Sequence, residues 1–127
     1  MLDTDSVSYA LRGVGQVAEN IVRRRPSEIC ISAITLAELR YGASHRKSQR
    51  LHGLIDSFTT NIAVMSFDED AATEFGGIAA ALAEKGIPIG VADVYIAAHA
   101  LASGAVLVTN NTKHFARVKA LQLENWT

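Results

Sequence analysis

The sequence predicts an α/β fold in which a central, mostly parallel sheet of four to five strands lies between layers of helices. Short β-rich apolar runs alternate along the chain with longer segments of helical periodicity. The apolar runs are continuous, which is typical of strands buried on both faces of a parallel sheet. The chain has 127 residues, the size of one domain with one core, so we expect a single domain over residues 1–127.

The first half of the chain contains two predicted strands and four predicted helices. Asp5 and Ser6 are typical of a helix start, and Gly13 and Gly15 mark a joint between two helices. Pro26 closes this unit. The expected order is a short strand ending at 1–3, helices over 6–12 and 14–25, a strand over 29–33, and helices over 35–43 and 47–58.

The second half alternates in the same way. Ser66 and Glu69 fit a capping box, in which the two side chains would bond to free amides at the start of a long helix. Gly86 and Pro88 then separate this helix from the next one. The expected order is a strand over 62–65, helices ending near 85 and 102, a strand over 105–108, a turn over 109–111 with a short helix, and a last strand near 121–123.

The composition excludes several classes of protein. No apolar run approaches the roughly 20 residues of a membrane span, and the start MLDTDS lacks the features of a signal peptide. The single cysteine, Cys30, excludes an internal disulfide framework, so we expect a cytoplasmic protein. A formal net charge of −1 argues against binding a nucleic acid by bulk electrostatics. A polyanion would have to be bound through a local patch or a metal ion.

Three acidic residues are expected at one edge of the predicted sheet. Asp3 ends the first strand, Glu38 lies one turn into the helix after the second strand, and Asp93 opens a nearly all-apolar helix. Ligands of parallel α/β sheets bind at the carboxyl ends of the strands. Three carboxylates gathered there would repel one another without a cation, and oxygen ligands select Mg²⁺, with Mn²⁺ as a substitute. The sequence therefore predicts a divalent metal site at this edge.

Each acid also has a structural interpretation that the sequence leaves open. Asp93 can complement the helix dipole in a first turn, and Glu38 can form a capping box with Thr35. The four histidines show no zinc-like spacing, and His99 is most simply a core residue.

The segment DTDSV at residues 3–7 allows a different enzyme class. It resembles the first motif of haloacid-dehalogenase phosphatases, in which Asp3 would be a nucleophile, and VLVTN at 106–110 resembles their second motif. That family places its metal-binding acids after the second motif, where this chain has only Glu124. Glu38 and Asp93 would then have no role.

A better match runs along the whole chain. Its six segments are MLDTD, SAITLAELRYGA, FDEDAA, IPIGVADVYIAAHAL, VTNNTKHFARV and LENW, in this order. Together they resemble the PIN domain, and within it the VapC-type toxins of bacterial toxin–antitoxin pairs. This resemblance implies a small PIN-like three-layer fold and a Mg²⁺-dependent endoribonuclease whose catalytic and metal-binding acids are Asp3, Glu38 and Asp93. It further implies an RNA substrate, a homodimer and a cognate antitoxin that neutralises the enzyme.

Two positions depart from the family pattern. Many PIN domains have a fourth acid where this chain has Asn111, which still offers an oxygen ligand but no charge. Asp5 stands where related proteins often have asparagine, and it restores negative charge. Thr4 and Thr109 are expected to hold waters or carboxylate rotamers near the site.

Positioning of the RNA requires nearby basic groups. The candidates for RNA contact are Arg12, Arg40, Lys113 and Arg117. The alternative within the same family is a module that binds RNA or an antitoxin without cleaving. Three retained acids speak against this alternative, because a pure binder has no use for mutually repelling carboxylates.

Overall fold

The computed structural model describes residues 1–127, and all strand pairs in it are parallel. β1 (Cys30–Ser32) pairs with β2 (Ala63–Met65), and β3 (Leu107–Val108) pairs with β4 (Leu123–Glu124). Leu2 forms parallel bridges to both Ile31 and Val108 and so joins the two pairs. The order is thus β2, β1, the Leu2 segment, β3 and β4. The predicted parallel sheet is confirmed, although its first strand is reduced to a bridging residue.

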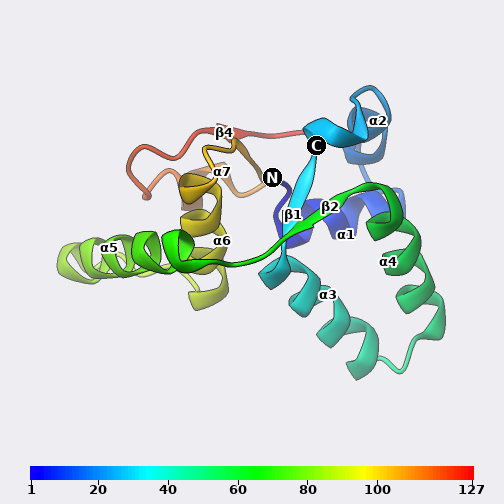
Figure 1. The fold of residues 1–127 in the computed structure, drawn as a ribbon, viewed down its shortest axis with the longest axis horizontal. Helices are drawn as coiled ribbons and strands as arrows, with labels where there is room; N and C mark the ends of the chain where they lie inside the picture. Colours follow the sequence, from blue (N-terminus) through cyan, green and yellow to red (C-terminus); the bar gives the residue numbers. More distant parts are fainter.

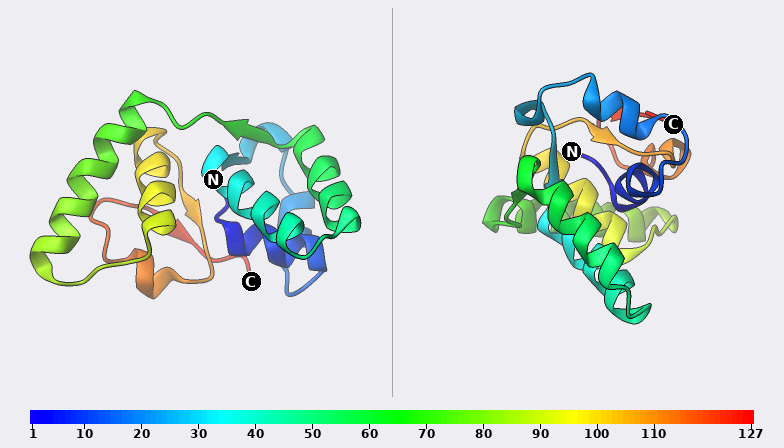
Figure 2. Two further views of the ribbon diagram at one scale, coloured as in Figure 1. Left: turned by 90° about the horizontal axis from the view of Figure 1, so that it is seen from below. Right: turned by 90° about the vertical axis from the view of Figure 1, so that its right-hand side faces the viewer.

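The helices lie on two sides of these strands, as Figure 1 shows, with α5 and α6 on one side and α3 and α4 on the other. The left view of Figure 2 shows α5 and α6 side by side, and the two helices are in contact. The helices are α1 (Thr4–Arg12), α2 (Val17–Val22), α3 (Ala33–His45), α4 (Gln49–Asn61), α5 (Glu69–Lys85), α6 (Val91–Ala102) and α7 (Thr112–Phe115), with a short 3₁₀ turn over Pro26–Glu28. Every predicted helix is present, with shifted ends.

Two hydrophobic clusters form the core because successive strand residues point to opposite faces. Met1 and Leu107 belong to the cluster that contains the buried residues of α5 and α6. Their chain neighbours Leu2 and Val108 belong to the cluster packed against α1, α3 and α4. The continuous apolar strands are therefore buried on both faces, as predicted.

Two helix starts differ from the predicted ones. The cap of α5 is Asp68, which accepts a hydrogen bond from the Ala71 amide at 3.0 Å, so the predicted cap at Ser66 is wrong. The cap of α3 is Ser32, which accepts from the Ile34 amide at 3.1 Å, and Thr35 lies inside the first turn. A Ser/Thr/Asp residue near a later Glu fits several registers, and the end of the preceding strand selects one of them.

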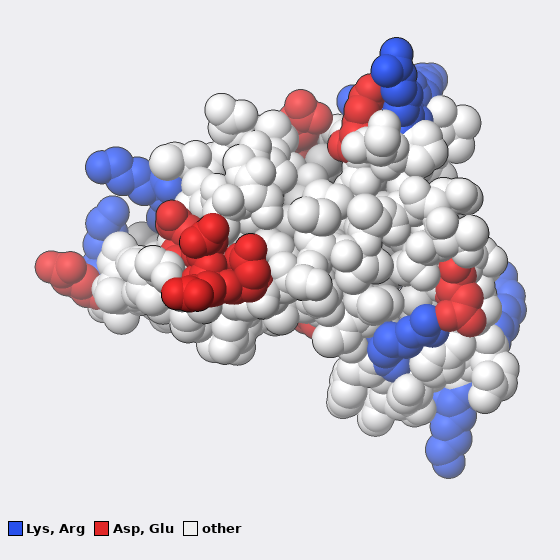
Figure 3. Space-filling view, in the orientation of Figure 1, with Lys and Arg blue, Asp and Glu red and all other residues white.

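One face of the molecule has few charges at its centre. Figure 3 shows the Lys and Arg side chains at the periphery of this face and an acidic group over the start of α5. The acidic residues there include Glu69 and Asp70, which complement the positive end of the helix dipole. The edge strand β2 is exposed along its length, including Val64 and Met65. None of the helices combines the length and apolarity needed to cross a bilayer.

Candidate functional site

Asp3 lies where the Leu2 segment meets α1, at the carboxyl end of the strands. Its amide donates to the carbonyl of Val108 at 3.0 Å, which fixes it beside the end of β3. Its side chain caps α1, because Oδ1 accepts the Ser6 amide at 2.8 Å. Asp3 is only 4% exposed. A carboxylate that ends a buried strand is thus held over the edge of the sheet.

Burial makes the carboxylate of Asp3 harder to ionise. Desolvation raises the pKa of Asp3 above its ordinary value of 3.8, although hydrogen bonds from Thr109 and Ser6 oppose the rise. Asp5 raises the pKa further by charge repulsion. The ionised form therefore lacks sufficient compensation from the protein alone, and a cation would supply it.

Glu38 reaches the same region from α3. The hydroxyl of Thr4 donates to Oε1 of Glu38 at 2.5 Å, and it also lies 3.3 Å from the hydroxyl of Thr35. The carboxylate of Glu38 is thus drawn towards the first turn of α1. The alternative in which Glu38 forms a capping box with Thr35 is wrong, because Ser32 caps this helix. Thr4 thus holds the carboxylate of Glu38, and the hydroxyl of Thr109 lowers the pKa of Asp3.

Asp93 occupies the first turn of α6. This helix and α3, which carries Glu38, lie on different sides of the strands (Figure 1). Asp93 accepts no hydrogen bond from the free amides of α6, so it does not cap its own helix. Its Oδ2 lies 3.2 Å from Nε2 of His114 on α7. Burial raises the pKa of Asp93, and the nearby His114 lowers it in part.

Asp5 links the acids electrostatically. Its charge raises the pKa of both Asp3 and Asp93, which indicates that Asp5 lies near each of them. Asp5 itself is exposed. Asn111, at the position of the expected fourth acid, is also exposed. Its backbone N–H donates to Thr109 Oγ1 at 3.0 Å.

The donor set suits a hard divalent cation. In the conformations observed, no three His, Cys, Asp or Glu side chains converge as a closed metal cage. Mg²⁺ seldom uses such a cage, because it keeps several waters and binds one or two carboxylates together with substrate phosphates. Two desolvated carboxylates with raised pKa, and a buried His114 nitrogen without a hydrogen-bond partner beside one of them, fit an open site of this kind.

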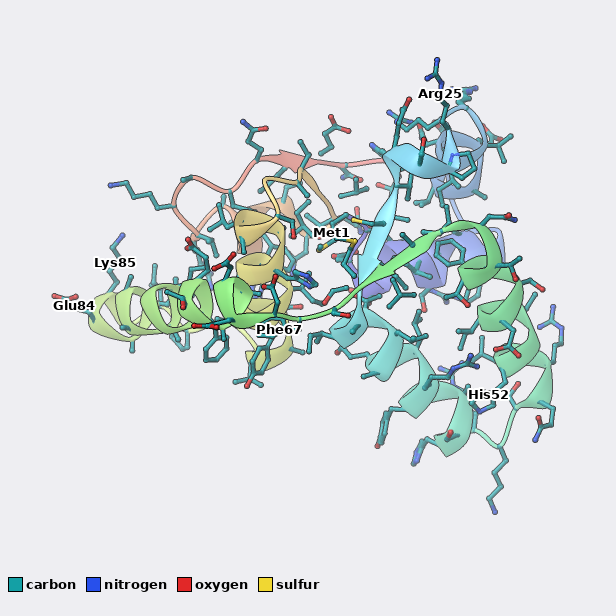
Figure 4. All side chains as sticks on the ribbon, in the orientation of Figure 1. Met1, Arg25, His52, Phe67, Glu84 and Lys85 are labelled. Atoms are coloured by element: carbon teal, nitrogen blue, oxygen red, sulfur yellow. The ribbon has the colours of Figure 1, made fainter.

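The predicted RNA contacts do not lie together. Arg40 is bound to α4, since its guanidinium pairs with Asp56 and contacts Nδ1 of His52 at 3.0 Å. Figure 4 shows His52 on α4 facing α3. Arg40 therefore joins two helices in this structure, and its expected contact with RNA stays a prediction.

The other three basic candidates differ in their distance from the acids. Arg12 is at the far end of α1 from Asp3, in a pocket that Arg46 also lines. Arg117 lines a groove with Leu101, at the far end of α6 from Asp93. Lys113 is exposed and directly precedes His114. Lys113 is thus the basic candidate next to the site.

Two histidines form contacts that bear on the site. His99 is buried, with Nδ1 2.7 Å from Ser32 Oγ, which confirms it as a core histidine. Figure 4 shows Phe67 beside α6, where its ring meets that of His99 edge to face. His114 was not among the predicted site residues. The signal that could have found it is its spacing, three residues after Asn111 in the turn that follows a strand.

By its fold and site, the protein belongs to the class of small parallel α/β proteins with carboxylates at the carboxyl edge of the sheet. The PIN domain family model matches residues 1–121. Ribonuclease VapC2 of Haemophilus influenzae is 38% identical over 138 residues, covering 99% of this chain and 96% of that protein. A tRNA(fMet)-specific endonuclease VapC of Shigella flexneri is also 38% identical, covering 100% and 97%.

Solved structures agree with these sequence matches. The DNA-bound VapBC of Salmonella typhimurium contains a chain with a TM-score of 0.91 and 37% identity, covering 100% of this chain and 97% of that one. VapBC2 of Rickettsia felis gives a TM-score of 0.87 and 36% identity, covering 100% and 98%. The chain belongs to the PIN-domain family and, within it, to the VapC ribonucleases. This membership also argues against the alternative of a haloacid-dehalogenase phosphatase.

Proposed function

We propose that this protein is a metal-dependent endoribonuclease that hydrolyses RNA phosphodiester bonds. The observation that carries the proposal is the burial of two carboxylates, those of Asp3 and Asp93. Both are desolvated carboxylates with raised pKa, both are exposed to the charge of Asp5, and Asp3 lies at the carboxyl edge of the sheet. Burying carboxylates without a cation to compensate them is costly for a purely structural site.

In this proposal the three acids bind the ion, and neighbouring hydroxyl and amide groups orient the acids. Asp3 and Asp93 would hold Mg²⁺, or Mn²⁺ in its place, and Glu38 would bind it directly or through water. When bound, such an ion lowers the pKa of a water molecule and offsets the charge that builds on the phosphate. Thr4 holds the carboxylate of Glu38, and Thr109 with Ser6 holds that of Asp3.

The site is better suited to one tightly held ion than to two. Asn111 contributes an amide in place of the fourth carboxylate that many PIN domains have. Asp5 adds a charge nearby, but it is exposed and interacts with Asp3 and Asp93 only through repulsion. A second ion would therefore depend on phosphate oxygens of the substrate.

Transfer RNA is the first substrate to test. The Shigella flexneri relative is named a tRNA(fMet)-specific endonuclease, and the present chain aligns with it over 100% of its length. The chain's net charge of −1 leaves RNA positioning to local groups such as Lys113, in the cytoplasm where such RNAs occur.

The decisive experiment measures RNA cleavage by purified Asp93→Asn and Asp3→Ala proteins with Mg²⁺. We expect kcat/KM to fall by about 100-fold or more, because groups that stabilise developing charge are removed. Asp70→Asn, on the exposed first turn of α5, is the matched control and should cleave normally. Wild-type rates in the site variants, or full activity in excess EDTA, would overturn the proposal. Binding of RNA without cleavage in the presence of Mg²⁺ would instead indicate a non-cleaving module.

The same proposal includes a cognate antitoxin. It is supported by the solved relatives, which are VapBC assemblies. Expression of the chain alone should arrest growth, and co-expression with the neighbouring reading frame should relieve the arrest. Absence of arrest in every condition would count against a toxin. The expected homodimer stays a prediction, to be checked by sedimentation of the purified chain.

A further inference from the structure

His114 presents a ring nitrogen to Asp93 from a separate element. Nε2 of His114, on α7, lies 3.2 Å from Oδ2 of Asp93, on α6. The atom is buried and lies at ion-pair distance from the carboxylate, but the contact does not have the geometry of a well-formed hydrogen bond. A buried polar atom without a partner is rare in folded proteins and calls for an explanation.

The ring is held by its surroundings. The His114 side chain is 23% exposed. Its ring packs edge to face against that of Phe115, with 5.5 Å between the ring centroids. Phe115 is fully packed in the core, and the His114 amide donates to the carbonyl of Asn111 at 3.2 Å. The backbone bond and the contact with Phe115 thus hold the imidazole in place, while the side chain of Asp93 is 38% exposed.

We propose that His114 is a positioning residue, which orients the carboxylate of Asp93 for the divalent ion. In this role Nε2–H would donate to Oδ2 and hold the carboxylate of Asp93 in one orientation, in which it could bind the ion. This inference rests on the proposed function. Carboxylates that bind metals are commonly hydrogen-bonded by such outer groups, and loss of one typically costs 10–100-fold in metal affinity.

A role for His114 as a direct ligand is less consistent with the chemistry. Mg²⁺ and Mn²⁺ sites are built mainly from oxygen ligands, whereas imidazole suits zinc, copper, iron and nickel. No third metal-binding side chain converges on the His114–Asp93 pair. The 3.2 Å contact already places the two groups close enough for a hydrogen bond. We expect this bond to form when Asp93 binds the ion.

The test compares His114→Leu, which removes the donor, with His114→Gln, which keeps an N–H donor. Mn²⁺ affinity is measured without RNA by electron paramagnetic resonance, and kcat and KM are measured at limiting and saturating Mn²⁺. We expect His114→Leu to weaken Mn²⁺ binding about 10–100-fold and to lower kcat at limiting Mn²⁺. Its KM for RNA should be unchanged, and His114→Gln should retain most of the affinity. His45→Leu, on the exposed end of α3, is the control.

Several results would overturn the inference. They are unchanged Mn²⁺ affinity in folded His114→Leu, equal defects in the Gln and Leu variants, or a spin-echo signal from a nitrogen bound directly to Mn²⁺. An additive loss when His114→Leu is combined with Asp93→Asn would also overturn it, because the two residues should act as one unit. Failure of the proposed function looks different: wild-type protein would not bind Mn²⁺, or Asp93→Asn alone would bind it normally.

Discussion

Thr4 on α1 donates its hydroxyl to Oε1 of Glu38 on α3 at 2.5 Å, across 34 positions of the sequence. This bond draws the carboxylate of Glu38, on the helix after β1, towards the start of α1, which Asp3 caps. It also explains why a threonine follows Asp3 directly: its side chain leaves the first turn of α1 in the direction of α3.

Removal of this hydroxyl should disturb both stability and activity. In Thr4→Val the shape is kept but Glu38 loses its donor, so we expect the free energy of unfolding to fall by about 1 kcal/mol and kcat/KM by about tenfold. Thr4→Ser should restore both. Urea unfolding and RNA cleavage with Mg²⁺ measure the two effects. The matched control is Thr73→Val on the exposed side of α5, whose hydroxyl bonds only its own helix. Equal behaviour of the two valine variants would contradict the assignment.

Replacement of Asp3 should stabilise the protein while it abolishes activity. Because burial raises the folded-state pKa of Asp3, the folded protein binds more protons than the unfolded chain between 3.8 and that higher value. Stability from this group is therefore present below pH 3.8 and is lost as pH rises through the folded pKa. Asp3→Asn removes the uncompensated charge, so we expect a higher melting temperature at neutral pH without metal.

The metal dependence of this effect gives its control. Mg²⁺ should raise the melting temperature of the wild-type protein but not that of Asp3→Asn, since binding to the folded state alone stabilises it. Asp70→Asn, which alters an exposed charge, should respond to Mg²⁺ as the wild type does. An Asp3→Asn protein that melts lower than wild type without metal would contradict the interpretation of Asp3 as a strained carboxylate.

His99 should support α3 in a pH-dependent way. Its Nδ1 contacts the hydroxyl of Ser32, the residue that caps α3, and burial lowers the pKa of His99 below its ordinary value of 6.5. A depressed pKa contributes stability above pH 6.5 that is lost as pH falls towards the folded pKa.

His99→Leu should therefore cost about 1–3 kcal/mol at neutral pH, because Ser32 loses a buried partner. It should also remove part of the loss of stability on acidification below pH 6.5. Chemical unfolding at several pH values measures both effects, with His45→Leu as the exposed control. An unchanged pH slope in the His99 variant would show that the ring takes up its proton over the same pH range in the folded and unfolded chains, contrary to expectation.

Lys113 and Arg40 should separate RNA binding from structure. Lys113→Ala removes an exposed charge next to His114, so RNA affinity should fall and the slope of its salt dependence should decrease by about one. Arg40→Ala breaks the contacts with Asp56 and His52, so it should lower the unfolding free energy. A salt slope equal to that of the wild type would assign Arg40 a structural role alone, and a decrease by about one would support its expected contact with RNA. Filter binding at several salt concentrations and thermal unfolding distinguish the two roles, and exchanged results would reverse the assignments.

Local patterns in the sequence predicted the order of the elements well. Apolar runs marked the strands, and glycines marked the helix ends: Gly13 and Gly86 adopt φ values of 67° and 66°, which glycine takes without strain. The helix starts were less accurate. Capping patterns occur in several registers, and hydrogen bonding at the strand ends selected Ser32 and Asp68 as caps.

The sequence by itself determined that a parallel sheet forms, that Asp3 ends a strand and that Asp93 opens a helix, because periodicity and chain order act over short distances. Only the tertiary structure decided the partners: Thr4 for Glu38, His114 for Asp93, and α4 for Arg40. Each of these pairs joins two different elements, which meet only in the packed fold. Side-chain direction and separation in the packed fold, which no local pattern contains, therefore determine what each group of the site contacts.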